Sequence, residues 1–174
     1  AACGGGGADR PVPTFVVTES DDTPGKWEIS YNGRGGVTIE QSGADYTLTP
    51  GDGTAEMVAV PSVGELYLAA GSFNATVAAL ETVDGTETIS GTGDITLTAL
   101  EGDLDADLSV VTTSGTKTVS ISDEAGTVNF TGDLGTGFAV SVGTGSTLST
   151  SASALNGQSI SGAGTVVIAG DLSS

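Results

Sequence analysis

The sequence contains no histidine, a single cysteine (Cys3), and only four basic residues, which are Arg10, Lys26, Arg34 and Lys117. Without histidine the chain lacks the usual general base, the Ser-His-Asp triad and the commonest transition-metal ligand. One cysteine allows neither an internal disulfide nor a cysteine-based zinc site. We therefore expect a protein that is not an enzyme and that carries no cofactor.

Positive charge is too scarce to balance the 22 acidic residues, so the formal net charge is −18. An acidic surface of this kind repels phosphate backbones and anionic lipid headgroups. The sequence also shows no apolar run long enough for a transmembrane helix. These features predict that the protein binds no nucleic acid and does not insert directly into a membrane.

Aromatic residues make up only 5% of the chain, whereas glycine occurs 28 times. Short alternating runs rich in β-branched residues, such as TFVVTE, KWEISY, GVTIEQ and DYTLTP, are separated by turn sequences with Gly, Asp or Asn. We expect an all-β fold of short strands. Asn32-Gly33 predicts a hairpin between KWEISY and GVTIEQ. The expected core of this region consists of Phe15, Trp27, Tyr31 and Tyr46.

Two decamers are nearly identical: AGTVNFTGDL begins at Ala125 and AGTVVIAGDL begins 38 residues later, at Ala163. A looser unit of glycine and alternating apolar residues starts at Gly64, Gly93, Gly126 and Gly164, at intervals of 29, 33 and 38 residues. Such repetition predicts stacked layers in which each unit covers the apolar face of its neighbour. We interpret the decamer as a strand and a corner used once in each layer.

Each GDL ending suits a corner, because glycine turns the chain, aspartate accepts backbone N–H groups, and leucine returns to the core. Solenoid-like stacking is favoured, with a β-sandwich as a close alternative. The expected organisation is a flexible leader over residues 1–13, an antiparallel β region over 14–62 and a β-repeat region over 63–174. One segment, NATVAALETV (74–83), is compatible with a short helical turn.

The stretch EGDLDADLS holds the best metal candidates, since Asp103, Asp105 and Asp107 alternate as in the first half of an EF-hand loop. Leu108 then stands where that loop requires glycine, and Ser114 where it requires a bidentate glutamate. The simpler interpretation is a solvated acidic face with Leu104 and Leu108 pointing inward. Calcium at the three aspartates remains the alternative.

The opening residues AACGGGG resemble the processed junction of a bacterial lipoprotein, in which the cysteine carries the lipid. On this interpretation Cys3 is acylated and the glycines form a tether. The alternative is a flexible leader that follows a removed initiator methionine.

The Gly-, Thr- and Ser-rich tract from about residue 85 onward, with ISGTGDITLT, DLSVVTTSGTKTVSIS and GTVNFTGDL, resembles the β-repeat tracts of phage virion fibres and decoration proteins. It is equally similar to repeats of bacterial surface adhesins and surface-layer proteins. The resemblance implies a non-enzymatic structural role and transfers no site residues.

The leading hypothesis is therefore a subunit of an extracellular assembly, on a virion surface, that associates with itself or with other structural subunits. A lipid-anchored adhesin that contacts a surface glycan or host receptor is the alternative. A β-solenoid enzyme acting on polysaccharide is a third hypothesis.

Overall fold

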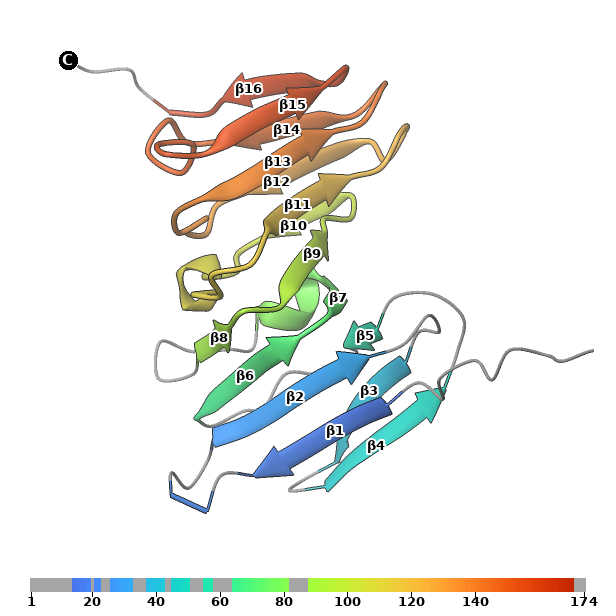
Figure 1. Ribbon diagram of the computed structural model, residues 1–174. Helices are drawn as coiled ribbons and strands as arrows, with labels where there is room; N and C mark the ends of the chain where they lie inside the picture. Colours follow the sequence, from blue (N-terminus) through green and yellow to red (C-terminus); the bar gives the residue numbers. More distant parts are fainter. Residues whose placement is uncertain are drawn as a thin grey trace, which may run out of the picture.

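The computed structural model describes residues 14–19, 21–22, 26–32, 37–42, 45–50, 55–57, 64–81 and 88–170. Before residue 64 it describes the backbone, with side chains only for Asp21, Asp22, Glu28 and Ile29. These residues form a β-solenoid whose successive coils stack through parallel strand pairing (Figure 1). The fold is all-β, as predicted, and the parallel pairing decides for the solenoid over the sandwich.

The strands belong to three sheets, with the orders β1-β2-β6-β8, β10-β12-β14-β16 and β15-β13-β11-β9-β7-β5-β3-β4. Their bounds are β1 Thr14–Glu19, β2 Lys26–Asn32, β3 Val37–Ser42, β4 Asp45–Pro50, β5 Ala55–Met57, β6 Glu65–Ala70, β7 Ser72–Thr76, β8 Thr88–Gly91, β9 Asp94–Thr98, β10 Gly102–Leu104, β11 Lys117–Ile121, β12 Thr127–Phe130, β13 Phe138–Val142, β14 Thr147–Thr150, β15 Ser159–Gly162 and β16 Thr165–Ile168.

Strands appear where the alternating runs predict them, because side chains at every second position can enter the core while the others face solvent. The expected helical turn is also present, as the 3₁₀ helix η1 (Val77–Leu80), whose N-cap Thr76 accepts a hydrogen bond from the Ala79 amide at 3.2 Å. A second 3₁₀ helix, η2, spans Leu108–Val110.

The predicted hairpin at Asn32-Gly33 is wrong. β2 pairs with β1 in antiparallel orientation and with β6 in parallel orientation, while β3 pairs antiparallel with β4 and parallel with β5. The strands on either side of Asn32-Gly33 therefore extend two different solenoid sheets. The four aromatic residues expected in this core have side chains outside the described part of the structure.

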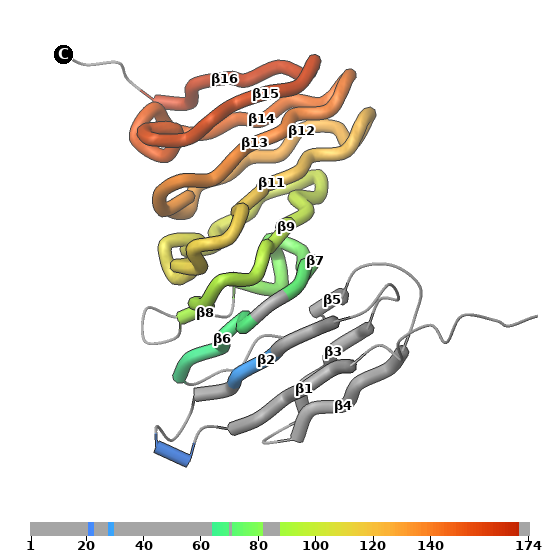
Figure 2. Tube along the Cα trace, viewed as in Figure 1, coloured from blue at the N-terminus to red at the C-terminus, as the bar shows by residue number. Residues whose placement is uncertain are grey.

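A coil, meaning one turn of the solenoid, holds three strands in the middle of the stack (β8, β9, β10) and two at its C-terminal end (β13 and β14, then β15 and β16). The tube in Figure 2 shows these coils lying one above another. From Phe73 to Ile95 to Lys117 the register advances 22 residues at each step, and from Lys117 to Phe138 it advances 21. The repeat is therefore shorter than the intervals that the glycine unit suggested.

The two decamers occupy β12 and β16, which are separated by β14. Thr127 lies beside Thr147, and Thr147 lies beside Thr165. The 38-residue interval is thus two coils, so the predicted use of the decamer once in each layer is wrong. The intermediate strand β14 does not repeat the decamer, because Thr150 stands where the two decamers have Phe130 and Ile168.

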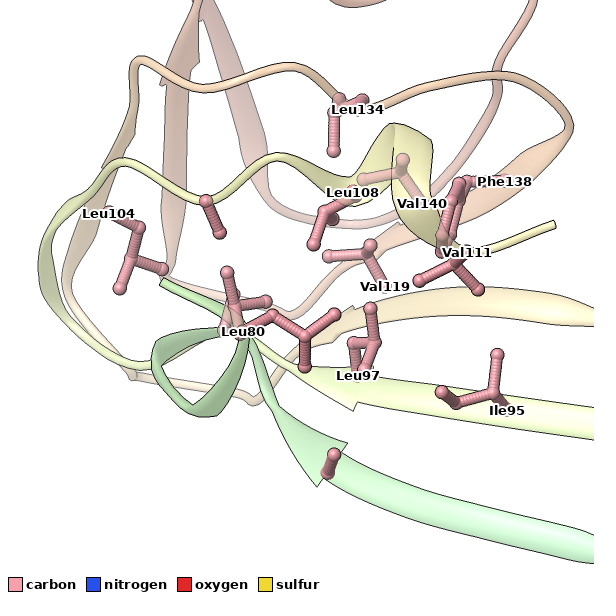
Figure 3. Close-up of a cluster of buried hydrophobic side chains, with 14 of the residues drawn as sticks. Leu80, Ile95, Leu97, Leu104, Leu108, Val111, Val119, Leu134, Phe138 and Val140 are labelled. Atoms are coloured by element: carbon pink, nitrogen blue, oxygen red, sulfur yellow. The ribbon is translucent and has the colours of Figure 1, made fainter. Parts of the chain in front are cut away.

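Inward-facing side chains form columns that run through the stack. Leu97, Val119 and Val140 lie beside one another in register and are 0%, 4% and 0% exposed. Figure 3 shows this column among neighbouring buried side chains, which include Leu104 of β10, Leu108 of η2 and Leu134. One continuous apolar core therefore links the coils, as expected for units that cover each other.

The corner at the end of the first decamer follows the predicted chemistry. Asp133 Oδ1 accepts a hydrogen bond from the Gly135 amide at 2.7 Å, and Leu134 is 2% exposed. A Cβ at Gly132 would lie 2.0 Å from the carbonyl oxygen of Ala106 in the coil below. The earlier GDL, at residues 102–104, is instead the strand β10, so the same tripeptide does not always make a corner.

We predict that Gly132→Ala lowers the free energy of unfolding by about 2–3 kcal/mol, because the added methyl group meets backbone that cannot move without shifting a coil. Urea denaturation followed by circular dichroism measures the change. Gly157→Ala is the matched control, since Gly157 has φ +77° but no atom within 4 Å of its Cβ position. Its cost should be only about 1 kcal/mol, from backbone strain alone. Equal losses in the two variants would contradict the steric explanation.

A second prediction concerns Thr150, which is 1% exposed and whose Oγ1 is buried without a hydrogen-bond partner. Thr150→Val removes this unsatisfied hydroxyl at nearly constant shape and should raise the unfolding free energy by about 1 kcal/mol. Thr113 provides the control: it is 3% exposed, and its Oγ1 donates to the Gly93 carbonyl at 2.7 Å. Thr113→Val should be destabilising in the same urea titration, so stabilisation or destabilisation by both variants would refute the assignment.

Candidate interaction surface at the C-terminal end of the solenoid

The last coil of the described stack, β15 and β16 (the terminal coil), continues the core columns but leaves them uncovered. Ile160 lies beside Val140 in register and is 45% exposed, whereas Val140 is fully buried. In the neighbouring sheet, Ile168 lies beside Thr150 and is 40% exposed, against 1% for Thr150. Positions that face the core in the coil below are thus exposed in the last described coil.

Three of the four large apolar side chains that are exposed in the described structure belong to this coil. They are Ile160, Val167 and Ile168; the fourth, Leu100, is 54% exposed and lies between β9 and β10. Val166, which is half-buried, packs against the core between them. We call Ile160, Val166 and Ile168, together with the outer edges of β15 and β16, the end face.

The end face also presents strand edges. β15 ends the eight-stranded sheet and β16 ends the sheet that begins at β10. β15 pairs with β13 below it, and β16 is held from below by the Thr165 amide on the Ser146 carbonyl at 2.9 Å and the Ala169 amide on the Thr150 carbonyl at 2.7 Å. On the other side no further strand of the described chain pairs with them, so their outward N–H and C=O groups can accept another β-strand.

The last two coils of the described stack contain no charged residue. Residues 134–170 contain no Asp, Glu, Lys or Arg, although the whole chain has a net charge of −18. Elsewhere the described Asp and Glu side chains are exposed or half-buried, and none of them is buried. The exterior is therefore acidic along the body of the stack and neutral over its last two coils.

The three aspartates proposed as calcium ligands lie near one another in sequence but hold separate backbone and side-chain partners. Asp103 Oδ1 accepts from the Asn129 side-chain amide at 2.9 Å, the Asp105 amide donates to Glu81 Oε1 at 3.2 Å, and Asp107 caps η2 through the Ser109 amide at 2.9 Å. No cluster of three or more His, Cys, Asp or Glu residues suited to a metal ion occurs among the described residues.

The simpler interpretation of this stretch, a solvated acidic face with the leucines inward, agrees with the burial. Leu104 is 5% and Leu108 is 0% exposed, whereas Asp103 and Asp105 are exposed. Aspartates elsewhere act between coils: Asp94 Oδ1 accepts from the Thr116 amide and Asp123 Oδ1 from the Thr144 amide, each at 2.7 Å. These carboxylates cap amides of the next coil, a role that requires no metal. Cys3, the candidate lipidation site, lies outside the described residues.

Lys117 is the only basic side chain that the structure describes. Its Nζ donates to the carbonyl oxygens of Val111 at 3.3 Å and Thr136 at 2.5 Å, and it lies 5.1 Å from the centre of the Phe138 ring. Burial disfavours the ammonium and lowers the pKa of Lys117 from its ordinary value of 10.5. The lysine fastens two successive coils at a turn, which is a structural role.

A hollow of about 390 Å³ is lined by Thr131, Gly132, Asp133, Ser151, Ser153 and Ala154. It offers hydroxyl and carboxylate groups but no aromatic side chain for stacking on a ligand.

The end face, with its exposed apolar side chains, was not predicted from the sequence. A signal for it was nevertheless present, as a 37-residue stretch without charge in a strongly acidic chain.

We predict that Lys117→Met lowers the unfolding free energy by about 1–2 kcal/mol at neutral pH, because two carbonyl groups lose their donor. Since the pKa of Lys117 is lowered in the folded state, the unfolded chain holds the proton more tightly, and the wild type gains stability as pH rises toward 10.5. Urea titrations from pH 7 to 11 should therefore show the advantage of the wild type over Lys117→Met growing with pH. An advantage that shrinks with pH would contradict the assigned burial.

No helix among the described residues is long and apolar enough to cross a membrane. Comparison with known proteins gives no match: no family model, curated protein or solved structure is significantly similar to the chain.

Proposed function

We propose that the protein is a non-enzymatic structural subunit of an extracellular assembly, with a phage virion component, such as a fibre, decoration or tail or capsid accessory protein, as the leading form. The observation that carries the proposal is the uncovered terminal coil, in which Ile160 and Ile168 are exposed where equivalent positions below are buried. An apolar coil face with open strand edges, as the last described coil presents, can be extended by a further strand at low conformational cost.

The charge distribution supports assembly through the end rather than through the sides. The described carboxylates along the body are solvent-accessible, so two bodies repel each other laterally. The last two coils carry no charge and are free of this repulsion. Structural subunits are therefore the preferred partners. A surface glycan or host receptor is a further partner in this proposal, and nucleic acid is disfavoured by the net charge of −18.

The alternative, a lipid-anchored bacterial surface adhesin, is favoured by one observation, the small residues before Cys3 and the glycines after it. It shares the extracellular location but attaches the protein to a membrane through a fatty acid rather than through a protein contact.

The source cells provide the test. We predict that quantitative mass spectrometry finds the protein in released particles or an extracellular assembly, with little in the cytosol. Recovery in the cell envelope, with loss from the membrane in a Cys3→Ser variant, would instead support the lipid-anchored alternative. Recovery in the cytosol, or hydrolysis of a polysaccharide panel by the purified protein, would refute the structural role.

A further inference from the structure

We propose that the end face binds the end face of a second copy of the same chain, so that the terminal strands of the two copies pair in antiparallel orientation across a two-fold axis. This inference rests on the proposed structural function and names the partner. The terminal coil, formed by β15 and β16, lies at the top of Figure 1.

The first argument is that the end face is complementary to a second copy of itself. Ile160, Val166 and Ile168 stand at the spacing of a solenoid coil, because each continues a column from the coil below. A partner that covers them needs apolar side chains at the same spacing and an open strand edge beside them. A second end face provides both, and a two-fold contact is self-complementary by construction.

In an antiparallel pair the inward side chains can meet inward side chains. If Val167 lies opposite Val167 of the second copy, then Val166 faces Ile168 of that copy on the core side of the sheet. The alternation of strand residues is preserved across the contact, so the apolar core of one copy continues into the core of the other. The same pairing satisfies outward N–H and C=O groups of both edges.

The second argument is electrostatic and favours a partner that is itself acidic. A basic partner would gain most by binding the carboxylate-rich body, and the neutral end would offer it nothing. For a second copy, by contrast, the neutral end is the region of least repulsion. Asp123 and Glu124 are among the nearest described charges, and they lie at a corner two coils below, since Thr144 stacks on Asp123 and the terminal coil stacks above Thr144.

With strands about 4.8 Å apart, these corner carboxylates on the two copies would be separated along the axis by roughly 24 Å. This separation is about three times the Debye length of roughly 8 Å at physiological ionic strength, so their repulsion is almost fully screened. Asp171, the next charged residue along the chain, lies outside the described residues.

The third argument disfavours the opposite end of the stack as the partner surface. The edge strands there are β1 and β4, which contain Glu19 and Asp45 respectively. A head-to-tail contact would set a strand bearing an acidic residue against the neutral end face, and would repeat without limit. A contact between two C-terminal ends closes after two copies.

The proposal is tested by size-exclusion chromatography with light scattering on the full chain in reducing buffer, which prevents a disulfide through Cys3. The wild type should elute as a dimer with twice the chain mass of 16.9 kDa. Dilution should convert this dimer to the monomer. Ile160→Asp and Ile168→Asp place a charge in the contact and should each raise the dimer dissociation constant about 100-fold. Both positions are partly exposed in the single chain, so the variants should fold, as circular dichroism would verify.

Leu100→Asp is the matched control, because Leu100 is also a large exposed apolar residue but lies away from the end face, and this variant should remain dimeric. A monomeric wild type, or a dimer that survives both end-face substitutions, would overturn the inference. So would oligomers that grow with concentration, which indicate head-to-tail stacking, or a dimer lost on deletion of residues 1–13. None of these results bears on whether the protein is found in an extracellular assembly, so the proposed function is judged separately.

Discussion

The structure depends on close contact between the backbones of successive coils. Parallel strands supply regular hydrogen bonds along the flat sides. Where a strand ends, the backbones of two coils can approach closely only if no side chain lies between them. Gly162, with φ +104°, illustrates the requirement, because a Cβ there would lie 2.0 Å from the Val142 carbonyl oxygen. The abundance of glycine is thus explained by contacts between layers as well as by turns.

The sequence predicted the parts of this fold that depend on local chemistry. Alternating runs became strands, Asp133 capped a turn beside the buried Leu134, and Leu104 and Leu108 pointed inward. These features follow from side-chain periodicity and from hydrogen bonding within a few residues, which a single sequence displays directly.

What the sequence did not predict depends on pairing between distant segments. The hairpin at Asn32-Gly33 is absent because β2 and β3 each find partners in a different sheet, and a turn sequence cannot report that competition. The coil length was overestimated because β14 has Thr150 where β12 and β16 have apolar residues, so it was not recognised as a further copy of the same strand. The candidate interaction surface was missed because exposure at an end is a property of the stack, and Ile160 and Val140 occupy similar sequence environments.

The coils also differ in size. Along one sheet the register step is 26 residues from Gly102 to Val128, then 20 from Thr127 to Thr147, and 18 from Thr147 to Thr165. A segment copied from the middle of the stack would therefore contain more residues per coil than the coils near the C-terminal end. A duplicated coil would fit best beside a coil with the same number of residues.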